Sequence, residues 1–261
     1  MDKISKLYKF LEENKKHNQK IQNGFYREST FQFYKPKDRI ISLLNAKLNT
    51  QSQLNLDNSY KFWKHIYEAI SGNSNCLDSL DDFIEVLSNN KKRKYKKFLA
   101  NDKLELLFYI LCDQPAWGEK TAALFVKSCC HIHWGVENEG LRFWTDSFPS
   151  KDESGRIFLP VDSVITYIFE QLEIKPAKFK TINDHLYKHY KSVDEMLLWD
   201  DLWYWGFISQ NSKPKDGSKD RKLEWNLSKY YSIFYASKDA NDIEQVKGLA
   251  TEFIKLLEDK N

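Results

Sequence analysis

Lys120 is the first group in this sequence whose surroundings point to chemistry. It lies in the first turn of an expected helix, directly after the break 115–118 (PAWG). A nearly continuous apolar stretch, 104–112, precedes the break, so the two helices should form a hairpin. The start of the second helix has unpaired backbone N–H groups, which attract phosphate together with the helix dipole. The sequence therefore predicts that Lys120 lies beside the backbone of a bound nucleic acid.

Asp162 is the second candidate, because it follows Pro160 and directly precedes an apolar helical stretch, 163–172. An Asp at this position is a good N-cap, and that structural role would be enough to explain it. Its carboxylate could also stabilise positive charge that develops on a substrate. Asp162 comes 42 residues after Lys120. The two residues, each at the start of its own helix, are the pair on which the functional interpretation depends.

Helices are the elements expected to position this pair. The chain has only 9 Gly and 6 Pro, too few for a turn-rich β architecture. Apolar residues recur at helical spacing from Ile4 in the first stretch to Leu257 in a closing amphipathic one. Further helices are expected at 38–48, 59–70, 81–87, 104–112, 121–130, 163–172, 183–190 and 193–205. The expected fold class is therefore mainly α.

Residues 134–160 interrupt the helical pattern. Gly and Pro punctuate this segment at positions 135, 140, 149, 155 and 160. The short apolar runs between them are typical of strands joined by turns. A small β-hairpin-like insertion is therefore expected here.

The break and the segment around Asp162 together resemble the helix-hairpin-helix DNA glycosylases. The hairpin of the members that also cleave the strand reads L-P-G-V-G-x-K-T-A, and this chain matches it at Pro115, Gly118, Lys120, Thr121 and Ala122. Ala116 replaces the first glycine, and Trp117 replaces a small apolar residue. The family's second signature, V-D-[TS]-H-V, resembles residues 161–165, with Val164 in place of the His. The absence of a cluster-binding cysteine pattern and the long interval from Lys120 to Asp162 are most similar to the archaeal 8-oxoguanine branch.

This resemblance implies two helical subdomains flanking a cleft. One is expected from residues 1–50 and 163–261, at the two ends of the chain. The other is expected from residues 51–162, and it would contain the hairpin at 104–130 and the insertion at 134–160.

The resemblance also implies an activity, base-excision repair of damaged double-stranded DNA with AP lyase action. The expected lesion is an oxidised purine, 8-oxoguanine. Lys120 would attack the sugar and form a Schiff base, while Asp162 would stabilise the positive charge on that sugar. The base must first rotate into a pocket where aromatic rings can stack on it. Asp201 and Trp205, four residues apart on one helix, resemble the acid and indole of the archaeal base pocket.

Contacts to the DNA backbone are expected from two stretches. The hairpin would supply backbone groups around Trp117 and Gly118. The run 91–97 has six positive charges in seven residues, and its expected contacts are Lys91, Lys92, Arg93 and Lys94. Lys and Arg bind phosphates without reading sequence, although such a run is also typical of a solvated helix face.

Two other functions stay open. The first is a non-catalytic helix-hairpin-helix protein that binds DNA structure and has no base pocket. The second is a monofunctional glycosylase in which Lys120 only holds phosphate.

Composition and cysteine spacing narrow the expected cofactors and partners. No CxxC pair occurs among the four cysteines, so neither an iron–sulfur cluster nor a zinc site is expected. The resemblance implies that no organic cofactor is needed, with a monovalent cation on the hairpin carbonyls as a further possibility. The chain has no long apolar stretch and begins with a polar segment. A cytoplasmic protein without a membrane partner is therefore expected, and the resemblance implies a monomer associated with the nucleoid.

Overall fold

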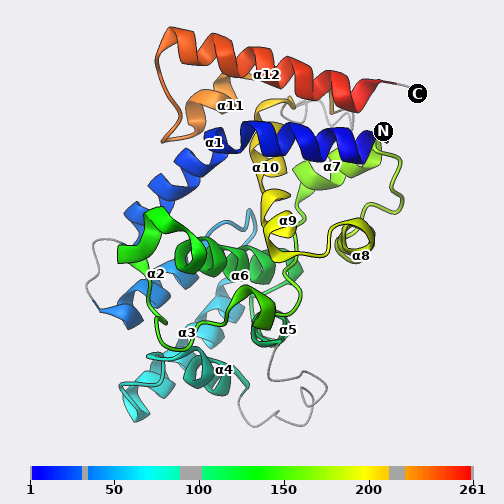
Figure 1. Ribbon diagram of the computed structural model, residues 1–261. Helices are drawn as coiled ribbons and strands as arrows, with labels where there is room; N and C mark the ends of the chain where they lie inside the picture. The colour runs from blue at the N-terminus through cyan, green and yellow to red at the C-terminus, as the bar shows by residue number, and fades with distance from the viewer. Residues whose placement is uncertain (1, 31–34, 89–101, 212–220, 260–261) are drawn as a thin grey trace. The chain divides into compact units, whose positions relative to one another are not determined.

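The computed structural model describes residues 2–30, 35–88, 102–211 and 221–259. Helices joined by turns make up this part of the chain, and it contains no β-strand (Figure 1), although an isolated bridge pairs Gln210 with Leu223. The expected mainly helical class is therefore confirmed. The expected backbone contacts at Lys91, Lys92, Arg93 and Lys94 lie outside the described residues.

The chain divides into two compact units. Unit 1 consists of residues 1–24 and 161–261, and unit 2 consists of residues 25–160. Residues 25–50 were expected to join the chain ends, but they belong to unit 2. The reason is that α2 (Pro36–Leu48) packs on α6 (Glu119–Trp134), the second helix of the hairpin.

Unit 1 contains the first part of α1 and the helices of the C-terminal half. In chain order they are α1 (Lys3–Thr30, which continues into unit 2), α7 (Ser163–Gln171), α8 (Phe179–His189), α9 (Val193–Leu198), α10 (Asp201–Ile208), α11 (Leu227–Ser232) and α12 (Ala240–Glu258). Figure 1 shows α12 running alongside the first half of α1. The ring of Phe10 lies 5.7 Å from that of Phe253 between these two helices. Their apolar faces, together with those of α7 and α10, form the core of the unit.

Side-chain caps fix where several helices of unit 1 begin. Ser192 and Glu195 form a reciprocal capping box at α9, and Asp239 accepts hydrogen bonds from two backbone N–H groups of α12. The sequence predicted one helix over 193–205, but the structure has two, because the chain turns at Trp199 and Asp200.

Unit 2 is built around the hairpin. Its helices are α2, α3 (Leu56–Gly72), α4 (Leu80–Ser88), α5 (Lys103–Cys112) and α6. The two hairpin helices occupy the positions that the apolar stretches indicated. The ring of Phe83 from α4 lies 6.2 Å from Phe125 of α6 and 5.4 Å from Trp144. Aromatic packing on α6 therefore holds the hairpin in place.

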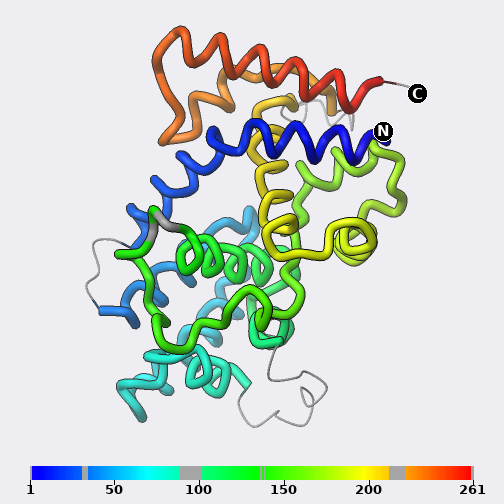
Figure 2. Tube along the Cα trace, in the orientation of Figure 1, coloured from blue at the N-terminus to red at the C-terminus, as the bar shows by residue number. Residues whose placement is uncertain are grey.

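The expectation of a β-hairpin at 134–160 was wrong. Two short 3-10 helices, η1 (Val136–Leu141) and η2 (Lys151–Glu153), occur instead, and Figure 2 traces the segment as a series of turns. Its apolar residues fill the core of unit 2 rather than pairing as strands: Trp144 is fully buried and donates its indole N–H to the Leu77 carbonyl at 3.0 Å. The carbonyl of Ser154 accepts hydrogen bonds from the first N–H groups of α5. The insertion thus supports the hairpin directly.

Candidate functional site

The turn of the hairpin has a left-handed residue where the resembled family has glycine. Ala116 has φ 68°, which an L-residue with a Cβ adopts only at a cost. The turn is held by the Trp117 N–H, which donates to the Gln114 carbonyl at 3.2 Å. The Gln51 side chain also donates to the Ala116 carbonyl at 2.9 Å. The hairpin therefore adopts a tight turn despite the substitution.

Trp117 faces the core of unit 2. Its side chain is only 6% exposed, and its ring lies 5.4 Å from Phe62 and 5.9 Å from Phe125. Only its backbone groups are therefore candidates for contact with a phosphate, which is the role that the sequence suggested for them. Its large ring fills the space between α3 and α6, and this packing accounts for an indole where the resembled family has a small residue.

The N-terminus of α6 is open to solvent. Gly118 is the N-cap residue, and no side chain caps the helix. Gly118 and Glu119 are exposed, and a Cβ built on Gly118 would meet no atom within 4 Å. The first N–H groups of a helix have no partner inside it. This terminus therefore has free donors and room for an anion.

Lys120 lies in the first turn of this helix and is half-buried. Within the described part of the chain, its ammonium group has no hydrogen bond and no ion pair. An amine without a carboxylate partner keeps its lone pair accessible after deprotonation. Lys120 therefore combines a position at an anion-attracting helix start with an uncommitted side chain.

Asp162 caps α7 and makes a further hydrogen bond that the cap does not require. Its Oδ1 accepts from the backbone N–H groups of Val164 at 2.8 Å and Ile165 at 3.0 Å. Its Oδ2 accepts from the indole N–H of Trp203 at 3.0 Å. Three N–H donors from two helices therefore fix the orientation of this half-buried carboxylate.

Trp203 connects Asp162 to a partly exposed aromatic surface. Its side chain is 38% exposed and stacks on Phe207, with ring centroids 4.9 Å apart and an interplanar angle of 12°. The ammonium group of Lys229 lies 5.1 Å from the Phe207 ring centre and donates to the Asn211 carbonyl at 3.4 Å. Burial and the positive charge of Arg221 lower the pKa of Lys229, opposed by Asp162. Lys229 is therefore a second amine near the candidate carboxylate.

Arg221 reinforces the start of α7 from the same side. Its guanidinium donates to the carbonyl of Ser163 at 2.7 Å and to the hydroxyl of Ser163 at 2.8 Å. It also donates to the side chain of Gln210 at 3.2 Å. The residue after Asp162 is therefore held by a cation, which places positive charge beside the carboxylate.

Asp201 and Trp205, the expected base pocket, both lie in the interior of unit 1. They are 3% and 0% exposed. Oδ1 of Asp201 accepts from the side-chain amide of Asn18 on α1 at 2.5 Å. Trp205 packs edge-on against Phe10 and His17, with ring centroids 5.1 and 5.7 Å away. In this structure the pair forms part of the packed core.

This buried region nevertheless contains polar atoms without partners. The Nε1 of Trp205 and the Nε2 of His17 are both buried and have no hydrogen bond to any part of the chain that the structure describes. The neighbouring Asp200 accepts a hydrogen bond from the Gln22 amide at 2.5 Å. Buried polar atoms are normally paired. Other buried nitrogens of the described residues, among them those of Trp117 and Trp199, also have no hydrogen bond, so this feature is not confined to the cluster.

The structure relates these candidates only within each unit. Asp162 lies beside Trp203, and Asp201 shares α10 with Trp205, all in unit 1, whereas Lys120 and the hairpin belong to unit 2. The sequence did not point to Phe207, Arg221 or Lys229, nor to the contact of Trp203 with Asp162. The aromatic–basic composition of 203–229 was the available signal, but a carboxylate–indole contact over 41 residues has no sequence pattern.

Neither a metal cluster nor a membrane span was found. Within the described residues, no three His, Cys, Asp or Glu side chains are grouped to hold a metal ion. No described helix is both long and apolar enough to cross a bilayer. The comparisons with known proteins gave no match to a family model, to a curated protein or to a solved structure.

Proposed function

We propose that this protein is a DNA base-excision glycosylase with AP lyase activity that removes an oxidised purine from double-stranded DNA. The observation that carries the proposal is the second hydrogen bond of Asp162. An N-cap needs one carboxylate oxygen, which here serves two backbone N–H groups. The other oxygen accepts a hydrogen bond from the partly exposed indole of Trp203. A carboxylate that acts on a bound substrate would need such a fixed orientation.

Cleavage of the glycosidic bond requires a carboxylate of fixed orientation. Breaking an N-glycosidic bond builds positive charge on the deoxyribose, and a preoriented carboxylate stabilises that charge without reorganising. Trp203 and the start of α7 give Asp162 this fixed orientation before DNA binds. Asp162 is therefore the electrostatic partner in the proposed reaction.

Lys120 supplies the nucleophile in the proposal. Its amine attacks C1′, and the base leaves with the electrons of the glycosidic bond. After the attached nitrogen loses a proton, its lone pair forms the C=N bond while the C1′–O4′ bond breaks and O4′ takes up a proton, which gives an open-chain Schiff base between Nζ and C1′. Removal of a C2′ proton then breaks the C3′–O bond, which is the lyase step. The open N-terminus of α6, with exposed Gly118, would hold the neighbouring phosphate.

The base pocket is proposed at Asp201 and Trp205. Their present burial means that the pocket must open when a flipped base enters. The orphaned Trp205 N–H and His17 nitrogen support this role, because the polar edge of a base would pair them. The lesion proposed is 8-oxoguanine.

A non-catalytic DNA-structure-binding protein is the second candidate. The observation that favours it is the burial of Asp201 and Trp205 at 3% and 0% exposure, since a protein without a base pocket would pack these side chains permanently. The open start of α6 would then be the functional feature.

A lesion panel separates the two candidates. Duplexes with a single 8-oxoguanine, uracil, hypoxanthine or abasic site are incubated with excess protein, and released base is measured by mass spectrometry. The proposal predicts release of 8-oxoguanine and cleavage of the abasic strand. Tight binding of these duplexes without base release or cleavage would instead show the non-catalytic function.

A further inference from the structure

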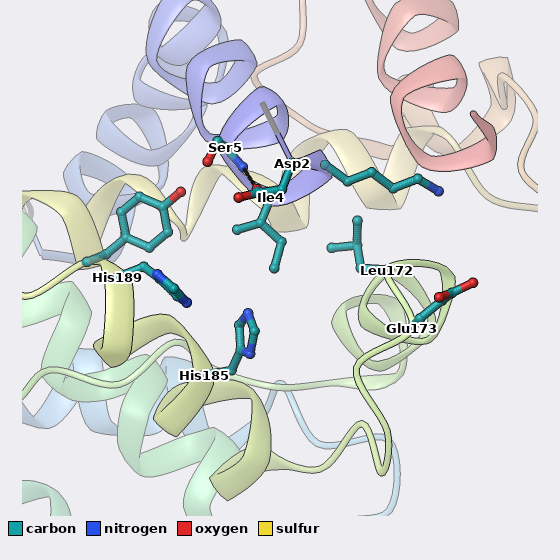
Figure 3. A pocket seen from close by; sticks show the side chains of 9 residues that line it. Asp2, Ile4, Ser5, Leu172, Glu173, His185 and His189 are labelled. Carbon is teal, nitrogen blue, oxygen red and sulfur yellow. Dashed lines mark hydrogen bonds between the residues drawn. The ribbon is translucent and has the colours of Figure 1, made fainter. Parts of the chain in front are cut away.

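A cavity in unit 1 lies away from the proposed catalytic residues. It has a volume of about 690 Å³ and lies where the start of α1 meets α8. Its polar lining consists of Asp2, Lys3, Ser5, Glu173, His185, His189 and Tyr190. Figure 3 shows both imidazole rings projecting from α8 toward the same open space, with Asp2 and Ser5 across from them. Nothing in the proposed DNA chemistry uses this cavity.

His185 and His189 have the spacing of a chelating pair. They are four residues apart on α8 and therefore lie on one face of the helix. Two His at this spacing on a helix are a known arrangement for binding zinc. The C-terminal end of a helix also favours a cation, and His189 is the last residue of α8.

The separation of the two rings fits a single bridging ion. Their centroids are 5.5 Å apart, with an interplanar angle of 49°. An ion bound at about 2.1 Å to one nitrogen of each ring, with a tetrahedral angle between the bonds, puts the ring centres about 5 Å apart. The pair therefore needs only a small side-chain adjustment to chelate.

Both rings are available for ligation. Neither imidazole has a hydrogen bond to any residue that the structure describes. His185 is half-buried and His189 is exposed, so an ion can reach the pair from solvent.

Carboxylates and lysines both lie near the pair. The carboxylate of Asp2 interacts electrostatically with both histidines, and Glu173 lines the same cavity. Of the nearby lysines, Lys3 is drawn toward α12, where its ammonium group donates to the Leu257 carbonyl at 3.3 Å. Lys188, which lies on α8 beside the two histidines, repels a bound cation through its positive charge.

The described part of the chain supplies only two ligands, so the site is an open one that water must complete. Because no group of three candidate ligands occurs in the described residues, the protein supplies two nitrogens and leaves the other positions to water. Imidazole ligands suit borderline divalent transition ions rather than Mg²⁺ or Ca²⁺. Such a site is open and exchangeable.

We propose that His185 and His189 bind one divalent transition-metal ion, of the class of Zn²⁺, Ni²⁺ or Cu²⁺, as a two-nitrogen chelate in this cavity. Water completes the coordination, and the carboxylate of Asp2 attracts the ion from across the cavity. The site is independent of the proposed DNA repair activity.

Copper binding tests the proposal on the full chain without an affinity tag. Electron paramagnetic resonance at one equivalent of Cu²⁺ is expected to show two equatorial imidazole nitrogens. Competition with a chelating dye is expected to give at least tenfold weaker binding for His185→Ala and for His189→Ala, with an unchanged far-UV circular dichroism spectrum. Lys188→Ala, a matched change on the same helix, is expected to bind at least as tightly as the parent protein.

The opposite results would overturn the site. Equal Cu²⁺ affinity in the parent protein and both alanine variants would place the ion elsewhere. A one-nitrogen spectrum in the parent protein would rule out chelation by the pair. Replacement by Gln, His185→Gln and His189→Gln, gives a second set of variants with side chains of similar size, so loss of folding cannot be mistaken for loss of ligation.

Discussion

The indole N–H of Trp203 donates to Oδ2 of Asp162 at 3.0 Å, while Oδ1 of the same carboxylate caps α7. This contact joins the start of α7 to α10 and links a candidate catalytic carboxylate to a partly exposed aromatic surface. Oδ1 thus serves the structural role of Asp162 as a helix cap, while Oδ2 is held in place for its proposed chemical role. Substitutions can test the two roles separately.

Trp203→Phe removes the hydrogen bond to Oδ2 and keeps an aromatic ring to stack on Phe207. Losing one hydrogen bond to a charged group costs about 1.5 kcal/mol, so we expect the single-turnover rate of base excision to fall about tenfold. Trp225→Phe, also in unit 1, is the matched control and should leave the rate unchanged. An unaltered rate in Trp203→Phe would mean that the indole does not position the carboxylate.

Substitutions of Asp162 separate the cap from the chemistry. Asn caps helices as well as Asp does, so Asp162→Asn should keep the cap of α7. Its amide NH2 cannot accept from the Trp203 N–H, so the melting temperature should fall, but by less than in Asp162→Ala, which loses the cap as well. The lost charge should nevertheless slow base excision at least about a hundredfold. Asp162→Ala should lose activity and also about 1 kcal/mol of stability. Full excision by Asp162→Asn would reduce this residue to a helix cap.

Ala116→Gly should stabilise the protein. The left-handed φ of 68° costs an L-residue about 1–2 kcal/mol, part of which is offset by the greater freedom of Gly in the unfolded chain. We expect a net gain of about 1 kcal/mol and a melting temperature a few degrees higher, measured by circular dichroism. Ala69→Gly within α3 is the matched control and should lower it. A lower melting temperature in Ala116→Gly would show that the turn is not strained.

His133 should make stability depend on pH. Burial and the charge of Arg142 lower the pKa of His133 to about 3, from an ordinary value of 6.5. Between these values the unfolded chain binds a proton that the folded chain does not, so stability falls as the pH drops from 6.5 toward 3. At pH 5 the loss is about 2 kcal/mol.

His133→Phe tests this dependence, because a phenyl ring can still stack on Phe148, 4.0 Å from the His133 ring centre. The difference between melting temperatures at pH 7.5 and pH 5 should shrink relative to the parent protein. Trp225→Phe, which changes no titratable group, is the control and should leave the difference as it was. If His133→Phe and the parent protein show the same pH dependence of melting temperature, the group whose titration changes the stability is not His133.

Local patterns in the sequence were enough to predict most of the helices and the hairpin turn, but not the division of 193–205 into two helices or the short α11. Apolar periodicity indicated α5 and α6, and the Pro–Gly break indicated the turn, because both signals depend on neighbouring residues. The insertion at 134–160 was misread as a β-hairpin. Gly and Pro mark turns, but Trp144 is buried by helices that are distant in the sequence, and local patterns do not contain that information.

The candidate site was predictable only in part. Asp162 was expected at a helix start, and the structure places it there as a cap. Its bond to Trp203 depends on how α7 packs on α10, which no local spacing encodes. The pair Asp201 and Trp205 has the helical spacing expected of a shared face, but spacing alone did not indicate that this face is buried.

In the proposed reaction, the amine of Lys120 forms the covalent bond to DNA. Borohydride reduces a Schiff base to a stable amine, so trapping on an 8-oxoguanine duplex, followed by peptide mass spectrometry, identifies the attached lysine. We expect the adduct at Lys120, its loss in Lys120→Gln, and its retention in Lys229→Gln. An adduct that persists in Lys120→Gln and maps to Lys229, or no adduct in the parent protein on a duplex whose base it releases, would contradict the account.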